Sequence, residues 1–143
     1  MANAVFPYAL EGFGLGEIDW DTAVIKAALV RGYTYSASHK FVSDVVAAGA
    51  TINASSAALT GKTAALGVFD ADDTTITTTA SAVNHGVLVY QSSAVAGGAD
   101  VATTAQRVIA WYDTGTGLPI QPGTGSTPIA WDSGTNRMFK FGG

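Results

Sequence analysis

The sequence predicts an all-β domain: a β-sandwich or jelly-roll-like fold with one short helix and an irregular N-terminal arm. From residue 58 onward the chain is a series of short runs rich in Thr, Val, Ile and aromatic residues, which favour pleated, half-buried strands. Gly, Asp and Asn separate these runs, as expected where turns join strands. The chain has 143 residues, of which 48% are apolar, so it is long enough for one domain with a substantial core.

The first twenty residues are apolar but interrupted by glycine. Val5, Phe6, Tyr8 and Phe13 share this segment with three glycines between positions 12 and 16, which we expect to break any helix or strand. An apolar segment without regular structure must lie on another surface, either its own domain or a neighbouring subunit. We therefore expect an arm over residues 1–20 and a β-sandwich domain over residues 21–143.

Two segments early in the domain have distinct patterns. Residues 22–32, TAVIKAALVRG, are continuously apolar up to Gly32 and predict a buried strand. Residues 36–49, SASHKFVSDVVAAG, carry apolar residues at helical spacing after Ser38, which can cap a helix. The second segment is therefore predicted to be the one short helix.

The rest of the chain predicts strands and turns. Residues 105–113 have apolar side chains at both odd and even positions, so both faces of that strand are expected to be covered, whereas 127–132 alternates like an ordinary sandwich strand. Residues 91–104 are small and polar and predict a long exposed loop available for contacts. The expected strands are 62–70, 73–80, 85–91, 105–113, 127–132 and 136–141.

The composition excludes several classes of function. Asp, Glu, Lys and Arg make up 13% of residues, about half the usual share, so we expect protein to cover much of the surface in an assembly. The net charge is −4 and the seven basic residues are scattered, which argues against nucleic acid as a partner. Cysteine is absent, so disulfides and thiol chemistry are excluded. The N-terminus lacks a signal-peptide pattern and no run is long enough to span a bilayer, so we expect a soluble protein with no membrane partner, made in a cytoplasm.

Two Asp-Ser/Thr-Gly triplets, at Asp113 and Asp132, are similar to the active-site motif of aspartic proteases. That chemistry requires two carboxylates about 3 Å apart that share a proton, each from its own lobe or subunit. Two copies so close in the chain do not meet this requirement, although a homodimer that uses only Asp113 remains conceivable. Asp, a small polar residue and Gly after a strand are typical of a type I turn with a bulge, so we interpret both triplets as turns.

Other motifs are weak. Residues 58–63, ALTGKT, end like a phosphate-binding loop, but Ser56 stands where the first glycine belongs and a strand is expected to follow. The carboxylates of 70–73, DADD, are interpreted as a solvated hairpin turn, with adventitious calcium as the alternative. His39 and His85 alone are too few for a zinc site. We expect no catalytic, cofactor-binding or metal-binding residues, and therefore no enzyme and no cofactor.

Four segments carry a resemblance to a known group of proteins. The combination of these segments is similar to small virion structural proteins of tailed bacteriophages, some of which resemble capsid cement (decoration) proteins with jelly-roll-like folds. The similarity covers roughly residues 18–143, and its motifs are turns and strand cores rather than a site. The segments are YTYSASHKFVSDV (33–45), AALTGKTAALGVFDADDTT (57–75), IAWYDTGTGLPI (109–120) and WDSGTNRMFKF (131–141).

The resemblance implies a capsid cement protein that stabilises the phage head by bridging major capsid protein subunits on its outer surface. It would be made in the host cytoplasm, reside on the virion and form homo-oligomers, dimers or trimers. We expect Val5, Phe6, Tyr8 and Phe13, together with the loop 91–104, to make the intersubunit contacts. The alternatives are a tail, neck or fibre-base component, or a carbohydrate-binding module on the particle that uses Trp111, Trp131 and Tyr112; the tryptophans are otherwise expected to be core residues.

Overall fold

The computed structural model describes residues 3–115, 117–134 and 137–140. The fold is mostly β, with 42% of residues in strands and 13% in helices, and the strands form antiparallel sheets. The predicted all-β class is confirmed. The elements are β1 (Ala4–Val5), α1 (Pro7–Gly14), β2 (Ala23–Arg31), α2 (Val42–Ala47), β3 (Thr51–Ser55), β4 (Thr63–Ala65), β5 (Val68–Asp70), β6 (Thr74–Thr78), β7 (His85–Ala96), a 3-10 turn (Thr103–Ala105), β8 (Val108–Tyr112), β9 (Gly125–Ile129) and β10 (Phe139–Lys140).

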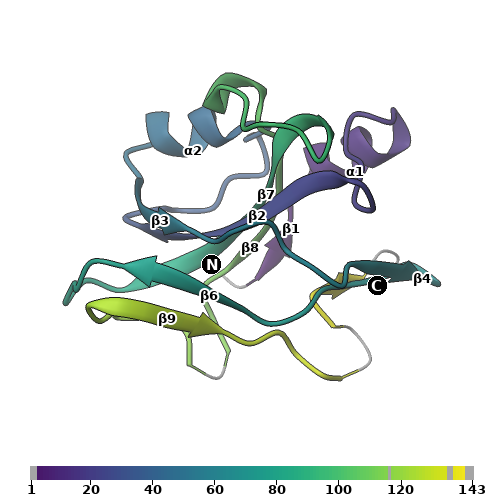
Figure 1. Ribbon diagram of the computed structural model, residues 1–143. Coiled ribbons are helices and arrows are strands. Elements are labelled where there is room, and N and C mark those ends of the chain that lie inside the picture. The colour runs from purple at the N-terminus through teal and green to yellow at the C-terminus, as the bar shows by residue number, and fades with distance from the viewer. Residues whose placement is uncertain (1–2, 116, 135–136, 141–143) are drawn as a thin grey trace.

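A five-stranded sheet in the order β1-β8-β7-β2-β3 forms the centre of the molecule. Its two longest strands, β2 and β7, run antiparallel, with Ala23 opposite Ala96 at one end and Arg31 opposite His85 at the other. Figure 1 shows α1 and α2 on one side of this sheet and the β6–β9 pair on the other. Four successive residues of β8, from Val108 to Trp111, are buried, so the expected coverage of both faces is confirmed.

Two smaller sheets complete the β structure: a three-stranded sheet in the order β10-β5-β4 and the pair β6–β9. The single strand predicted over 62–70 is in fact a hairpin, because Leu66 and Gly67 both have positive φ (52° and 78°) and reverse the chain between β4 and β5. The turn expected at 70–73 does not join a hairpin either, since β6 pairs with β9 rather than with β5. Residues far apart in the sequence therefore form this layer.

The expectation of an irregular arm is wrong for residues 4–14. Ala4 and Val5 pair with β8, and Pro7 begins the helix α1, where its fixed φ is already helical. Phe6, between these two elements, is fully buried. Gly12 does not break the helix; it lies where a Cβ would be 2.7 Å from Arg107 Nη2 and from Ile18, so its missing side chain makes room for both.

The exposed loop predicted at 91–104 is also wrong in its first part. β7 continues to Ala96, and Gln91, Ser92 and Ser93 are buried. Their polar groups are satisfied inside the fold: Gln91 Oε1 accepts the Asp19 N–H at 2.8 Å, and Ser93 Oγ donates to the Val95 carbonyl at 2.7 Å. Polar composition therefore concealed a buried strand.

The short helix predicted within 36–49 is present as α2, although Ser38 does not cap it. Instead, the Asp44 carboxylate in its first turn accepts the backbone N–H groups of Lys40 and Phe41, each at 2.9 Å. One hydrophobic core then runs through the molecule and includes Trp20, Trp111 and residues of α1, α2 and every sheet. Among the described residues, none of the helices has the length and apolar character needed to cross a bilayer.

Candidate functional site

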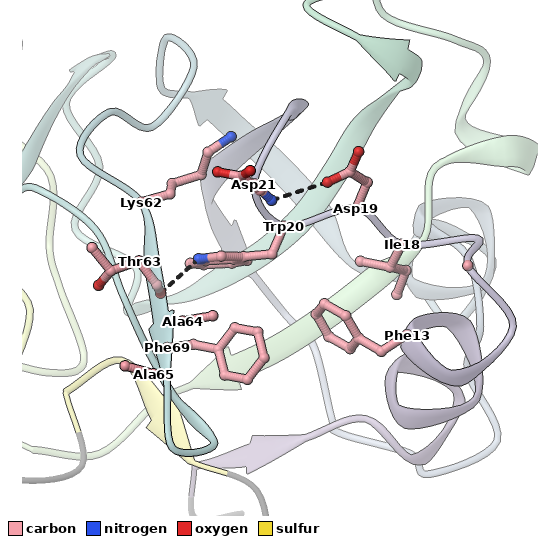
Figure 2. Close-up of a pocket in the computed structure, with 11 residues that line it drawn as sticks. Phe13, Ile18, Asp19, Trp20, Asp21, Lys62, Thr63, Ala64, Ala65 and Phe69 are labelled. Atoms are coloured by element: carbon pink, nitrogen blue, oxygen red, sulfur yellow. Dashed lines mark hydrogen bonds between the residues drawn. The ribbon is translucent and has the colours of Figure 1, made fainter.

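An open cleft of about 890 Å³ lies at the end of the molecule where α1, the segment 16–21 and strand β4 meet. We call it the end cleft. Figure 2 shows its side chains, with Phe13 on α1 facing Phe69 on β5, and the Trp20 indole beside Phe69 with its N–H directed at Thr63. Its lining residues are Phe13, Gly16, Ile18, Asp19, Trp20, Asp21, Lys62, Thr63, Ala64, Ala65 and Phe69.

Aromatic rings form the floor of the end cleft. The edge of Trp20 meets Phe69 at 5.5 Å between ring centroids, and Phe13 approaches the same Phe69 ring at 5.2 Å. Phe139 of β10 stacks on Phe69 from behind at 4.7 Å. These are favourable aromatic geometries, and Trp20 Nε1 also donates to the Thr63 carbonyl at 3.0 Å (Figure 2). The floor is therefore a fixed apolar surface.

The polar rim of the end cleft is tied into the backbone. Asp19 accepts the hydroxyl of Thr22 and the backbone N–H groups of Asp21 and Thr22, and these bonds, the hydroxyl first, lower the pKa of its carboxyl. Lys62 Nζ donates to the Ala23 carbonyl at 2.7 Å; burial lowers the pKa of this amine, while the carboxylates of Asp19 and Asp21 oppose the shift. These groups hold the cleft in shape.

Exposed leucines flank the end cleft on two sides. Leu15, next to the lining residue Gly16, is 66% exposed at the end of α1, and Leu66, next to Ala65, is 98% exposed at the tip of the β4–β5 hairpin. All three residues of β4 are exposed as well. We call the end cleft, β4, Leu15 and Leu66 together the end surface. It combines a hollow that has an aromatic floor and a polar rim with protruding apolar side chains, a combination found at protein-binding surfaces.

The structure distributes the four predicted contact residues unevenly. Phe13 lines the end cleft, and Tyr8 is half-buried on α1, with Lys40 Nζ 5.5 Å from its ring centre. Val5 is half-buried in β1 opposite Ala110. Phe6 is fully buried and packs on Tyr35 at 5.0 Å, so in this fold it faces the domain's own core.

Sequence reasoning did not identify Trp20, Leu15 or Leu66 as part of a surface. The expected arm ends at Trp20, and the expected strand over 62–70 includes Leu66. A signal was present at the second position: glycine directly after Leu66, flanked by short apolar runs, is compatible with a two-residue hairpin turn. Leucine at the first turn position is unusual, which hid the turn.

The two Asp-Ser/Thr-Gly triplets form turns in different ways. The Asp132 carboxylate accepts the Gly134 N–H at 3.1 Å, as the turn interpretation predicts. At Asp113 the turn is held from outside: Asn3 Oδ1 accepts the N–H groups of Asp113 and Thr114 at 2.9 and 3.1 Å, and Asn3 Nδ2 donates to the Thr114 carbonyl at 2.9 Å. The Asp113 carboxylate accepts the indole N–H of Trp111 at 3.1 Å.

The remaining motifs have structural partners. Lys62 of the ALTGKT segment leads directly into β4, so a strand follows this motif, as predicted. The three carboxylates of 70–73 have separate partners: Asp70 lies 3.8 Å from Arg137, Asp72 accepts the Thr60 hydroxyl at 3.1 Å, and Asp73 accepts the backbone N–H of Trp131 at 2.9 Å. Within the described ranges, no group of three or more His, Asp or Glu side chains converges as a metal site would require.

The histidines are also engaged within the fold. His39 Nδ1 lies 2.7 Å from the Tyr33 hydroxyl, and His85, which is fully buried, has Nδ1 2.7 Å from the Val83 carbonyl. These contacts tie the two rings to neighbouring residues of the same chain.

A second cleft of about 910 Å³ lies between β8, β9 and the segment after β9; we call it the side cleft. Tyr112 and Trp131, two of the three residues considered for carbohydrate binding, line it, and their ring centroids are 6.0 Å apart. Asp132 and Asn3 also line it. Trp111 is 2% exposed and belongs to the core, as predicted. Trp131 is half-buried at the cleft wall, with Nε1 donating to the Asp72 carbonyl at 3.1 Å.

Comparison of the chain with protein-family models, with curated proteins and with solved structures finds no match.

Proposed function

We propose that this chain is a bacteriophage capsid cement (decoration) protein that stabilises the head by bridging major capsid protein subunits on its outer surface. The end surface carries this proposal, because it presents the exposed Leu15 beside a hollow with an aromatic floor. The class of partner is the one that the resemblance of the four segments implies, since the comparisons identify no relative. The scarcity of charged side chains, 13% of residues, is consistent with a surface that protein covers.

The mechanism requires only shape and apolar area. Each Å² of apolar surface removed from water contributes roughly 25 cal/mol, so a contact of a few hundred Å² contributes several kcal/mol before the costs of association. A cement protein that touches two capsid subunits gains further from multivalency, because the second contact forms at a high effective concentration. The sheets of the folded domain already hold the contact residues in position, so no segment of the chain has to become ordered on binding.

The structure changes the contact residues that we propose. Phe6 is fully buried, so it acts as a core residue, and deletion of residues 2–16 would remove β1 and α1 as well as any capsid contact. We assign the capsid contact to Leu15 and Phe13 of the end surface, with Tyr8 beside them on α1. Leu10 is also 48% exposed on this helix, but it lies on the opposite flank of α1 from Tyr8 and Leu15.

The test is binding to phage heads that lack the protein. Purified wild-type chain should bind at a copy number that matches the capsid lattice and should raise the temperature at which the heads rupture. Leu15→Gln should weaken binding, whereas Val83→Gln should not. Val83 is 48% exposed but precedes the His85 end of β7, opposite the end surface. Failure of the wild-type chain to bind heads would contradict the proposal, and a copy number that matches the portal or tail would support a tail, neck or fibre-base role.

The side cleft favours a second candidate, carbohydrate binding on the particle surface. Tyr112 and Trp131 provide aromatic rings, and Asn3 and Asp132 provide polar groups, in the combination that sugar sites use. Under this hypothesis a host-surface glycan should shift the tryptophan emission of the wild-type chain, and Trp131→Phe should abolish the shift. An unchanged spectrum with every glycan tried would remove this candidate.

A further inference from the structure

We propose that two copies of this chain associate through their β4 strands across a twofold axis, so that two three-stranded sheets join into one continuous antiparallel sheet. This inference goes beyond the capsid role and does not depend on it, because the contact involves only copies of this chain. It rests on the direction of backbone groups in β4, the position of the end cleft and the conformation of Leu66.

β4 is an edge strand whose free side is open. Among the strands of the described residues it pairs only with β5, in the sheet order β10-β5-β4, and all three of its residues are exposed. Figure 1 shows it at the far end of the molecule, away from β6 and β9. The other edge of that sheet, β10, has two residues, and in the central sheet β3 is linked to the end of β6 by Asn53, whose Nδ2 donates to the Thr79 carbonyl at 3.3 Å.

The hairpin geometry fixes which backbone groups of β4 are free. Leu66 and Gly67 form a two-residue turn with positive φ at both positions, so Ala65 and Val68 are the hydrogen-bonded pair that closes it. Hydrogen-bonded and non-hydrogen-bonded pairs alternate along an antiparallel ladder, so Ala64 and Phe69, the next pair, do not hydrogen-bond to each other. The Phe69 carbonyl confirms this phase, since it accepts the Met138 N–H on the β10 side at 3.1 Å. The N–H and C=O of Ala64 therefore point to the free edge.

This free edge borders the end cleft. Four consecutive residues, Lys62 to Ala65, line the cleft, whereas β5 contributes only Phe69. Successive side chains of a strand point to opposite faces, and Figure 2 shows Ala64 directed toward the rings of the cleft while Thr63 and Ala65 point away from them. The cleft therefore lies against the Ala64 face of β4, next to the free edge of this strand. A strand that paired with β4 would lie at the mouth of the cleft.

A second copy of β4 is complementary to this edge. If Ala64 lies opposite the partner's Ala64, each residue donates its N–H to the other's carbonyl, which is the closely spaced pair of an antiparallel ladder. In the same register Thr63 lies opposite the partner's Ala65, and Lys62 lies opposite the partner's Leu66. Since Lys62 is the only charged residue in these three pairings and lies opposite a leucine, the twofold places no like charges against each other.

Leu66 is the residue that most needs such a contact. It occupies a left-handed turn position, φ 52°, where Gly, Asn or Asp are preferred, and its side chain is 98% exposed. In a monomer, asparagine would be more favourable than leucine at this position, because it adopts the left-handed conformation more readily and exposes less apolar surface. In the twofold pair, Leu66 lies beside Lys62 of the other copy, at the mouth of that copy's end cleft, where Trp20 and Phe69 form an apolar floor. The dimer therefore gives this leucine a partner.

The experiment measures the association of the purified chain by sedimentation equilibrium. We expect a reversible monomer–dimer equilibrium for the wild-type chain. Leu66→Asn should raise the dissociation constant at least about tenfold while preserving or raising the thermal stability of the monomer, because asparagine accepts the left-handed conformation. The control Val83→Asn, at the opposite end of the molecule, should leave the dissociation constant unchanged.

A second variant reports the register. The chain has no cysteine, so Ala64→Cys introduces a single thiol. Directly opposed residues of a hydrogen-bonded pair have Cα atoms about 5.5 Å apart, a separation that a disulfide can span. Under mild oxidation Ala64→Cys should form a covalent dimer efficiently, and Val83→Cys should not.

Several results would overturn the proposal: a wild-type chain that stays monomeric at the highest soluble concentration, a trimer instead of a dimer, association that Leu66→Asn leaves intact, or equal cross-linking of the two cysteine variants. These outcomes are separate from the capsid role. Heads decorated by monomeric Leu66→Asn protein would leave that role standing.

Discussion

Arg107 and Glu17 form an ion pair that joins the sheet to the segment after α1. The Arg107 side chain is 4% exposed, and Nη1 donates to the Glu17 carboxylate while Nη2 donates to the Tyr8 carbonyl. One guanidinium thus contacts the chain both at the first turn of α1 and three residues beyond its end. This contact makes the first twenty residues part of the folded domain.

Arg107→Ala should destabilise the fold by about 2–4 kcal/mol, because it removes two charge-assisted hydrogen bonds and leaves a cavity beneath α1. The matched control is Lys26→Ala. Lys26 pairs with Asp100 at 2.9 Å on the surface, where the Asp100 side chain is 50% exposed, so its loss should cost less than about 1 kcal/mol. Urea unfolding followed by circular dichroism measures both. Equal losses for the two variants would contradict the role assigned to Arg107.

Two glycines of α1 should respond in opposite directions to the same substitution. Gly12→Ala places a methyl group 2.7 Å from Arg107 Nη2 and Ile18, and should destabilise the fold by about 1–3 kcal/mol. Gly14→Ala, at the end of the same helix, meets nothing within 4 Å and should stabilise it by a few tenths to about 1 kcal/mol. Thermal unfolding of the pair measures the difference. If both changes prove neutral, residues 7–14 do not form the helix described here.

The strand predictions succeeded where burial and composition agreed. Residues 22–32 and 105–113 are apolar on both faces, and they became β2 and β8 of the central sheet. The Asp132 turn was predictable because its hydrogen bond is local, from Gly134 to the Asp132 side chain. In these cases the residues that determine the structure are neighbours in the sequence.

The predictions failed where a distant partner decides the structure. Gly12 was interpreted as a helix breaker because Arg107, which fills the space beside it, is remote in the sequence. Ser93 falls in the expected exposed loop because its partner, the Val24 N–H, belongs to another segment. The end cleft could not be predicted for the same reason: its walls come from α1, the segment 16–21 and the β4–β5 hairpin, and tertiary packing alone brings them together.

High pH should destabilise the fold through two partly buried tyrosines, Tyr33 and Tyr112. Burial raises the pKa of Tyr33 from 10.0 to about 12, and burial raises the pKa of Tyr112 as well. Because the folded-state pKa lies above the unfolded value, the unfolded chain loses these protons first. The stability contribution is therefore complete below pH 10 and is lost as the pH rises toward about 12.

Free energies of unfolding measured between neutral pH and pH 12 should show this decline, and Tyr33→Phe should make it shallower. The variant also removes the hydrogen bond between the Tyr33 hydroxyl and His39, so its stability at neutral pH serves as its own reference. An identical slope for the variant and the wild-type chain would show that Tyr33 ionises normally in the folded state.

Asn3 should contribute more to stability than its place near the chain start suggests. Its side chain accepts two backbone N–H groups, from Asp113 and Thr114, and donates to the Thr114 carbonyl, so it closes the turn after β8 in the way that a cap closes a helix end. Asn3→Ala should therefore cost about 1–2 kcal/mol, the range found for lost caps.

Asn3→Asp keeps the acceptor oxygen but loses the amide donor, and should cost less. Asn84→Ala is the control, because the Asn84 side chain accepts a hydrogen bond from Gln121 at the surface, at 3.0 Å, and its loss should stay within about 0.5 kcal/mol. Chemical denaturation ranks the three variants, and an Asn3→Ala variant as stable as Asn84→Ala would show that the turn forms without Asn3.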